Sequence, residues 1–242
     1  MKQNAKKAND PNKRVTSYSA RAIWTGFPST IKWLQNQRSA DKTLLERVEF
    51  HERDRGFNAT IILLSAACLE GFLVECLNSY TIGNRFASKD TFEGRLDHAF
   101  LKRVSTAMFK DFPELFTLTL GKPLSELITD DNLIEGVEAL RAFRNGIAHA
   151  RPVIYQTCAE DLDDDVDYEM EGQYKTIHEY LEKRKLIYGH EDIFQSKIAD
   201  HFAGLVRPYM EAVVPLLPVP QSDNVKMLAK MAFKTKSTSA KT

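Results

Sequence analysis

The chain has 242 residues, of which 43% are hydrophobic and 27% are charged, and its formal net charge is zero. These values are typical of a soluble globular protein that can bury a sizeable core without disulfides. A net charge of zero predicts no strong attraction of the whole chain to nucleic acid or to a membrane.

The sequence predicts a cytoplasmic protein. Its first residues, MKQNAKKANDPNKR, are basic and polar and lack the apolar core of a signal peptide. The longest apolar run, 59–69, is too short to span a bilayer. The three cysteines, Cys68, Cys76 and Cys158, form neither a disulfide framework nor a CxxC pair. We therefore expect no membrane partner, no metal site and no cofactor.

The first half of the chain predicts helices behind a disordered basic tail at 1–17. A short helix is expected at 29–38, with Ile31 and Leu34 on its inner face. A longer helical stretch covers 41–78, and Gly56 is expected to break it. The second half of this stretch is apolar on nearly all sides, which predicts a position at the centre of a helical bundle.

The second half of the chain predicts four more helices, at 92–109, 131–149, 173–188 and 191–217. Asp131 is expected to cap the second of these, and Pro208 and Pro215 to kink or break the last. No alternating pattern indicates a strand. The expected fold is an all-α antiparallel bundle in a single domain, 18–221, whose core is 40–155 and whose C-terminal helices cover 173–217. A disordered basic tail is expected from 222 to 242.

An acidic segment at 160–171 contains eight Asp and Glu residues and no basic residue. Such a block repels itself and is usually a solvated loop. A second hypothesis is that it mimics phosphate and folds over a basic site. Deletion of the segment separates the two interpretations.

The helix expected at 131–149 carries the residues best suited to chemistry. Arg141, Asn145 and His149 recur every four residues and share a face, and Arg144 lies beside Asn145. Arg144 and His149 are five residues apart, so their side chains converge only through their length or because Gly146 loosens the turn. The simpler interpretation is that these basic residues stabilise the helix C-terminus.

The segment Arg144-Asn145-Gly146-Ile147-Ala148-His149 resembles the Arg-x4–6-His motif of HEPN domains. The earlier apolar helix, with its Leu69-Glu70 step, resembles the first core helix of that family. The resemblance covers about residues 40–155, and Ala150-Arg151-Pro152 departs from the usual ending of the motif.

This resemblance implies a metal-independent endoribonuclease of the toxin or antiviral-defence kind. RNA supplies its own nucleophile, the 2′-hydroxyl, and a histidine near its reference pKa of about 6.5 can move the proton. His149 would have that role, and Arg144 would stabilise charge on the phosphate. Asn145 would orient His149 or a phosphate by a hydrogen bond. Two motifs usually meet across a homodimer in this family, so a twofold-symmetric dimer through 131–149 is expected.

Three other residues are supporting candidates. Arg141 and Arg151 could extend the contact with phosphate, although the residue type and position favour a solvated or salt-bridged role for each. Glu70 could pair with Arg144. It could instead lie on the helix surface or satisfy a polar group in the core.

Two alternatives to the ribonuclease remain. One is a non-catalytic HEPN dimer that binds a nucleotidyltransferase antitoxin, a nucleotide or another protein partner. The other is a structural helical protein in which the motif occurs by chance.

Overall fold

The structure is a computed structural model that describes residues 22–38, 48–81, 91–149, 155–157, 168–170, 173–188, 192–218 and 221–233. Its elements, in chain order, are η1 (Ile23–Gly26), α1 (Phe27–Arg38), α2 (Val48–Thr81), α3 (Phe92–Ser105), η4 (Phe109–Asp111), α4 (Phe112–Leu120), α5 (Leu124–Leu127), α6 (Asp131–Ala148), β1 (Tyr155–Thr157), β2 (Tyr168–Met170), α7 (Gln173–Lys183), α8 (Ser196–Val213), η5 (Val214–Leu216) and α9 (Gln221–Ala232). The prediction of an all-α fold is confirmed.

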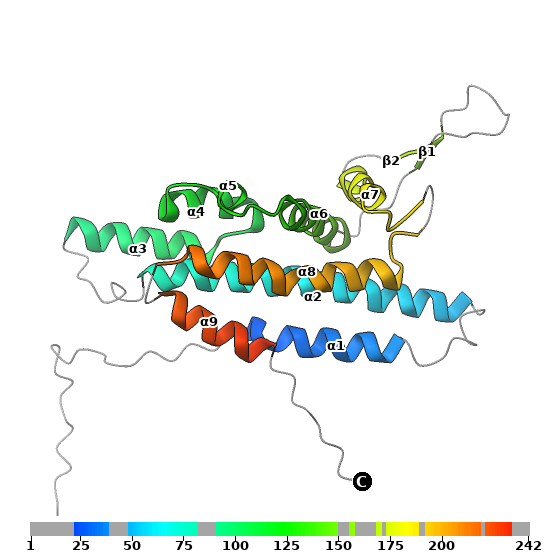
Figure 1. The fold of residues 1–242 in the computed structure, drawn as a ribbon, viewed down its shortest axis with the longest axis horizontal. Helices are drawn as coiled ribbons and strands as arrows, with labels where there is room; N and C mark the ends of the chain where they lie inside the picture. The colour runs from blue at the N-terminus through cyan, green and yellow to red at the C-terminus, as the bar shows by residue number, and fades with distance from the viewer. Residues whose placement is uncertain are drawn as a thin grey trace, which may run out of the picture.

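The helices form three layers (Figure 1). Helices α2 and α8 lie side by side in the middle layer. Helices α4 to α7 cover one side of this layer, and α1 and α9 cover the other. The buried apolar side chains from all three layers form one cluster.

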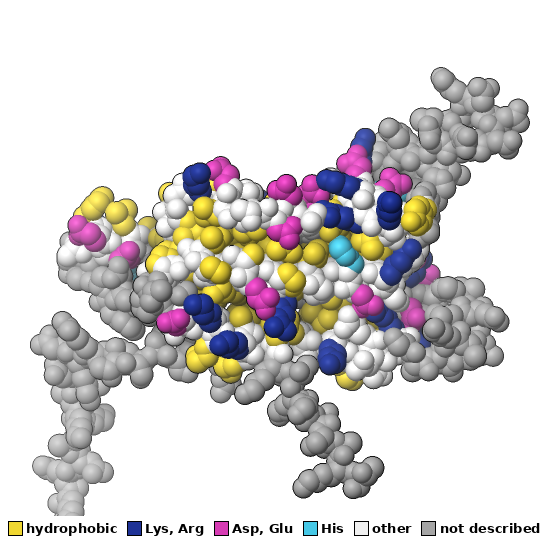
Figure 2. Space-filling view, viewed as in Figure 1, with side chains coloured by type: hydrophobic (Ala, Val, Ile, Leu, Met, Phe, Trp, Pro, Cys, Tyr) yellow, Lys and Arg dark blue, Asp and Glu magenta, His cyan; other side chains and the backbone are white. Residues whose placement is uncertain are grey.

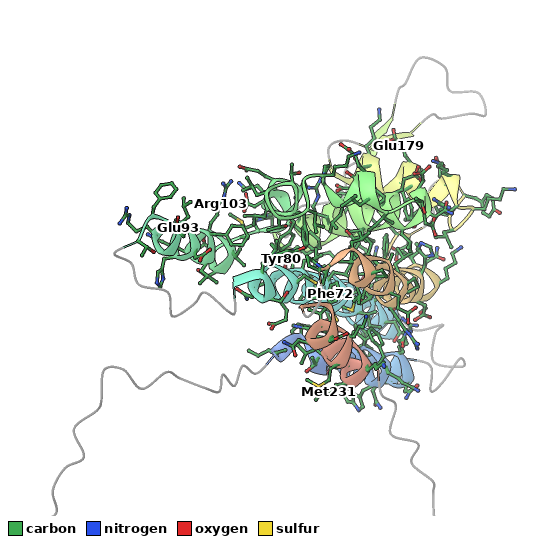
Figure 3. The ribbon with its side chains drawn as sticks, turned by 60° about the vertical axis from the view of Figure 1, so that its left-hand side comes forward. Phe72, Tyr80, Glu93, Arg103, Glu179 and Met231 are labelled. Carbon is green, nitrogen blue, oxygen red and sulfur yellow. The ribbon has the colours of Figure 1, made fainter. Side chains whose placement is uncertain are left out.

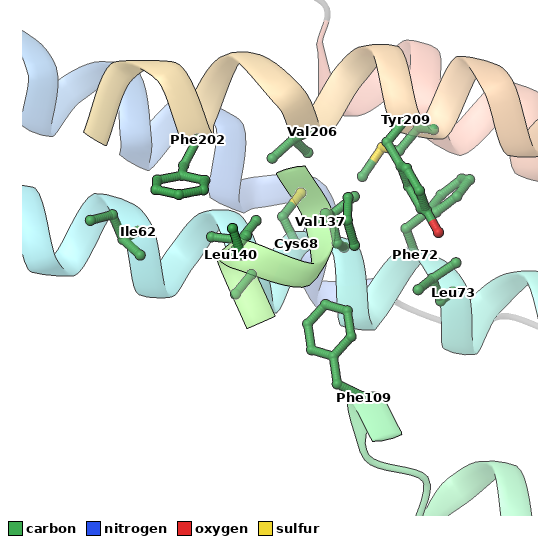
Figure 4. Close-up of a cluster of buried hydrophobic side chains, with 14 of the residues drawn as sticks. Ile62, Cys68, Phe72, Leu73, Phe109, Val137, Leu140, Phe202, Val206 and Tyr209 are labelled. Atoms are coloured by element: carbon green, nitrogen blue, oxygen red, sulfur yellow. The ribbon is translucent and has the colours of Figure 1, made fainter. Parts of the chain in front are cut away.

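Helix α2 is the centre of that cluster. Its inward residues include Ile62, Leu69 and Phe72, none of which has any exposed surface. Figure 4 shows Phe72 of α2 between Tyr209 of α8 and Leu73 of α2, with Leu140 of α6 packing over the same helix. Because α2 is apolar on nearly all sides, it is stable only when other helices cover it from several directions.

A segment of α2, Glu52–Tyr80, is long and apolar enough to cross a bilayer by length and composition alone. The apolar stretch is thus longer than the sequence run 59–69 indicated. Within the bundle 56% of this segment is buried, as in the core helix of a soluble protein.

Several predicted boundaries were wrong. Helix α2 continues through Gly56, because this glycine is exposed and the helix bonds do not depend on its missing side chain. The N-cap of α6 is Asp130, whose carboxylate accepts from the N–H of Asn132, and not Asp131. Pro208 lies inside α8 without ending it, and the chain changes to a 3-10 turn only at Pro215.

Three features were absent from the sequence prediction. Residues 112–127 form α4 and α5, and residues 221–232 form α9 where a disordered tail was expected. Residues 155–157 pair with 168–170 in an antiparallel ladder, so the end of the acidic segment is a strand and not a loop. Residues 158–167, 1–21 and 234–242 lie outside the described residues.

A buried polar junction joins α1, α2 and α8. The guanidinium of Arg38 donates to Asn58 Oδ1 at 2.7 Å and forms an ion pair with Asp200. The Asn58 amide donates to the carbonyl of Phe194 at 2.7 Å. Every polar group in this junction thus has a partner, which offsets the cost of burial.

Two glycines of α2 give opposite predictions for the same substitution. A Cβ on Gly71 would lie 2.6 Å from Trp24 Cβ, whereas a Cβ on Gly56 would meet nothing within 4 Å. Gly71→Ala should lower the free energy of unfolding by about 1–3 kcal/mol through overpacking. Gly56→Ala should raise it by roughly 0.5–1 kcal/mol through helix propensity. Urea unfolding followed by circular dichroism measures both, and equal effects of the two substitutions would contradict this account.

Candidate functional site

Helix α6 is held against α7 and α8 by two close approaches at glycines. A Cβ on Gly146 would lie 2.9 Å from the phenol ring of Tyr174 on α7, and one on Gly136 would lie 2.6 Å from Cδ1 of Leu205 on α8. The helix remains regular through Gly146. The glycine is therefore explained by the packing of Tyr174 and not, as the sequence suggested, by a loosened turn.

Arg144 is engaged on two sides. Its Nη1 donates to Asn145 Oδ1 at 3.1 Å, and its Nη2 lies 3.5 Å from Glu70 Oε2 on α2. The expected contact between Glu70 and Arg144 is therefore present. It ties the polar face of α6 to the central helix.

Glu70 is a partly buried carboxylate. Burial raises its pKa, while the charge of Arg144 and the backbone N–H of Phe109 lower it by less. The carboxylate is thus held among groups that favour its ionised form, but these do not fully offset the loss of hydration. The charge of Arg144 is the largest of the contributions that favour the ionised form of Glu70.

His149 is the C-cap of α6, and its backbone N–H donates to the carbonyl of Asn145 at 3.2 Å. The residue is exposed. Among the described residues, its imidazole makes no hydrogen bond or ion pair, with Arg144 or with any other side chain. The two motif residues are therefore not bonded to each other within one copy of the chain.

The remaining candidates divide into two groups. Arg141 is partly exposed on α6 and forms an ion pair with Glu138, one turn earlier. Arg151 lies outside the described residues, as do residues 160–167 and Glu171 of the acidic segment. The structure therefore unites Glu70, Arg144 and Asn145, and places Arg141 and His149 on neighbouring parts of the same helix.

The sequence analysis missed a second polar cluster, between α6, α7 and α8. The hydroxyl of Tyr180 lies 2.7 Å from His201 Nε2. The guanidinium of Arg184 lies 5.5 Å from the centre of the Tyr180 ring and donates to Glu135 at 3.1 Å. Sequence spacing gave no signal for this cluster, because its members come from three helices.

Burial, and to a lesser degree the charge of Arg184, lowers the pKa of His201 below its ordinary value of 6.5. The unfolded chain then binds more protons than the folded one below pH 6.5. Stability contributed by neutral His201 is present above pH 6.5 and is lost as pH falls through the lowered pKa.

We expect His201→Gln to lose less stability than the wild type between pH 7 and pH 5, measured by urea unfolding. Tyr180→Phe, which removes the hydrogen bond but keeps the ring, should retain the wild-type pH dependence because burial is the main cause. An unchanged pH dependence in His201→Gln would contradict this assignment.

The described residues contain no group of three or more His, Cys, Asp or Glu side chains that could hold a metal ion. Comparison of the chain with protein-family models, with curated proteins and with solved structures gives no match. Any statement about activity therefore rests on the site itself.

Proposed function

We propose that this protein is a HEPN-type, metal-independent endoribonuclease that acts as a toxin or defence effector. The observation that carries the proposal is the end of α6, where an exposed imidazole follows an arginine that Glu70 and Asn145 orient. This supplies a proton-transfer group and a phosphate-binding group on one helix. The motif resemblance supplies the reaction class.

In the proposed reaction, the 2′-hydroxyl of RNA attacks the adjacent phosphorus and the 5′-oxygen leaves. A neutral imidazole takes the proton from the 2′-hydroxyl, and a protonated one donates a proton to the leaving oxygen. The products are a 2′,3′-cyclic phosphate and a 5′-hydroxyl. Arg144 would hold the phosphate oxygens as negative charge accumulates on them.

A single α6 supplies one histidine, whereas this reaction uses an acid and a base. A second copy related by twofold symmetry would bring a second His149 to the same cleft. The proposal therefore includes a homodimer through the exposed end of α6.

A second candidate is a non-catalytic HEPN dimer that binds a protein partner or a nucleotide. The ion pairs of α6 favour it, because Arg144 and Arg141 already hold Glu70 and Glu138. Phosphate would have to compete with these carboxylates. The two candidates differ in whether the purified protein cleaves RNA.

The decisive measurement is cleavage of RNA by the full chain in EDTA. Arg144→Ala and His149→Ala should each lower the rate by about 100-fold or more, since each removes one catalytic group. His98→Ala and Arg103→Ala are matched controls, because these residues are also five apart on one helix, α3, and should keep wild-type activity. A wild type that does not cleave, or variants that cleave equally well, would exclude the ribonuclease in favour of the binding module.

The dimer gives a separate prediction. Ala148 is exposed at the end of α6, so Ala148→Arg should place two like charges in the proposed interface and shift the protein towards monomer. Ala99→Arg, at an exposed position on α3, should leave association unchanged. Sedimentation velocity distinguishes the monomer from the dimer. A monomeric wild type would contradict the proposed interface.

A further inference from the structure

A small cleft lies where the layer of α4 to α6 meets the layer of α2 and α8. On the face shown in Figure 2, hydrophobic side chains lie along the junction of these layers and charged side chains border it. The cleft has a volume of about 60 Å³. Its floor includes Leu73 and Val137, which are buried, and its mouth includes Ser125 and Glu138, which are exposed. Figure 3 places Phe72, the neighbour of Leu73 in α2, in the interior of the molecule, so the cleft reaches towards the core.

Tyr209 of α8 brings a buried phenol to this cleft. It is 5% exposed, and its hydroxyl forms no hydrogen bond with the described residues. Figure 4 shows this hydroxyl directed from α8 towards Leu73 of α2, which also lines the cleft. Burial, and to a lesser degree the charge of Glu138, raises the pKa of Tyr209, so the hydroxyl keeps its proton at neutral pH. Buried tyrosines usually bond through this group. Tyr209 therefore offers the cleft a donor that no described residue takes up.

The cleft adjoins the candidate site on α6. Glu138, Arg141 and Asn145 follow each other at intervals of three and four residues, so they share one face of the helix. The rise from Glu138 to Asn145 is about 10 Å at 1.5 Å per residue. Phe109 also joins the two places, because its backbone N–H faces the Glu70 carboxylate and its side chain lines the cleft. A nucleotide whose phosphate lies at the motif arginine can therefore direct its base into the cleft.

We propose that this cleft binds one base of the RNA, cytosine, in a nucleotide beside the scissile phosphate. The carboxylate of Glu138 accepts a hydrogen bond from the amino group on C4 of the base, and the hydroxyl of Tyr209 donates to the neighbouring ring nitrogen, N3. Carboxylates are suited to this amino group because they only accept hydrogen bonds. The base preference rests on the proposed function, for which it names the preferred substrate.

The size of the cleft favours a pyrimidine. A volume of about 60 Å³ has room for roughly four water-sized groups, which suits a single six-membered ring better than the fused rings of a purine. The rings of Phe109 and Phe112 meet edge to face with their centres 5.7 Å apart, and both line the cleft. Bases of single-stranded RNA are commonly held against aromatic side chains in this way. Adenine, which carries a similar amino group, is therefore excluded by its size.

The hydrogen-bonding groups distinguish cytosine from uracil. Cytosine has a donor on C4 beside an acceptor at N3, whereas uracil has an acceptor on C4 beside a donor at N3. Glu138 and Tyr209 present an acceptor and a donor, which complement cytosine. Uracil would set its O4 against a carboxylate, and such a mismatch of acceptors is a common source of specificity. The ion pair with Arg141 holds the carboxylate of Glu138 at the cleft.

Calorimetric titration of the full chain with nucleoside 3′,5′-bisphosphates tests the base preference without requiring cleavage. The wild type should bind the cytidine compound about tenfold or more tightly than the uridine or adenosine compound. Glu138→Gln should reduce the preference for cytidine over uridine to within roughly twofold, because an amide can turn to suit either base. Tyr209→Phe should weaken binding of cytidine several-fold and keep the core packed.

Glu114→Gln is the matched control, because Glu114 also pairs with an arginine, Arg103, but does not line the cleft. This variant should keep the wild-type preference. Equal binding of the three compounds by the wild type, or an unchanged preference in Glu138→Gln, would overturn the proposed base site.

Cleavage of an RNA that contains every pair of neighbouring bases separates this inference from the ribonuclease itself. The wild type should cut beside cytidine, and Glu138→Gln should cut with little preference for any base. Cleavage by the wild type without preference would overturn the base site and leave the ribonuclease. Preferential binding of cytidine that requires Glu138, with no cleavage, would support the base site and exclude the ribonuclease.

Discussion

Burial of α2 is the constraint on which the arrangement of the other helices depends. Its apolar residues face every direction, so α1, α3, α6, α8 and α9 must all pack against it. Close approach at Gly71 admits Trp24, and the buried amide of Asn58 is satisfied by Arg38 and by a carbonyl of the segment before α8. The same packing brings Glu70 of α2 to the polar face of α6. The geometry of the candidate site is therefore a consequence of how the helices pack around α2.

The contact between Glu70 and Arg144 has two effects that oppose each other in function. It orients the guanidinium and neutralises a partly buried carboxylate, which favours a fixed site. The same ion pair engages part of the positive charge of Arg144, which would otherwise be available to bind an RNA phosphate. In a catalytic site the conflict disappears if Arg144 is attracted more strongly to the phosphate of the transition state than to Glu70. Catalysis depends on interactions that strengthen in the transition state. A binding module has no such requirement.

The sequence by itself determined the all-α class, the central position of α2 and the helix that carries Arg144, Asn145 and His149, because these depend on local hydrophobic periodicity. The same periodicity was present in α9, where Val225, Leu228 and Ala232 face the core, but the polar residues between them suggested a disordered tail. The paired strands at 155–157 and 168–170 are too short to show an alternating pattern.

Tertiary structure alone decided the rest. The contacts of Glu70 with Arg144, of His201 with Tyr180 and of Gly146 with Tyr174 all join different helices of the chain. Spacing along a sequence carries no information about such contacts, since they are set by which faces of the helices are buried together.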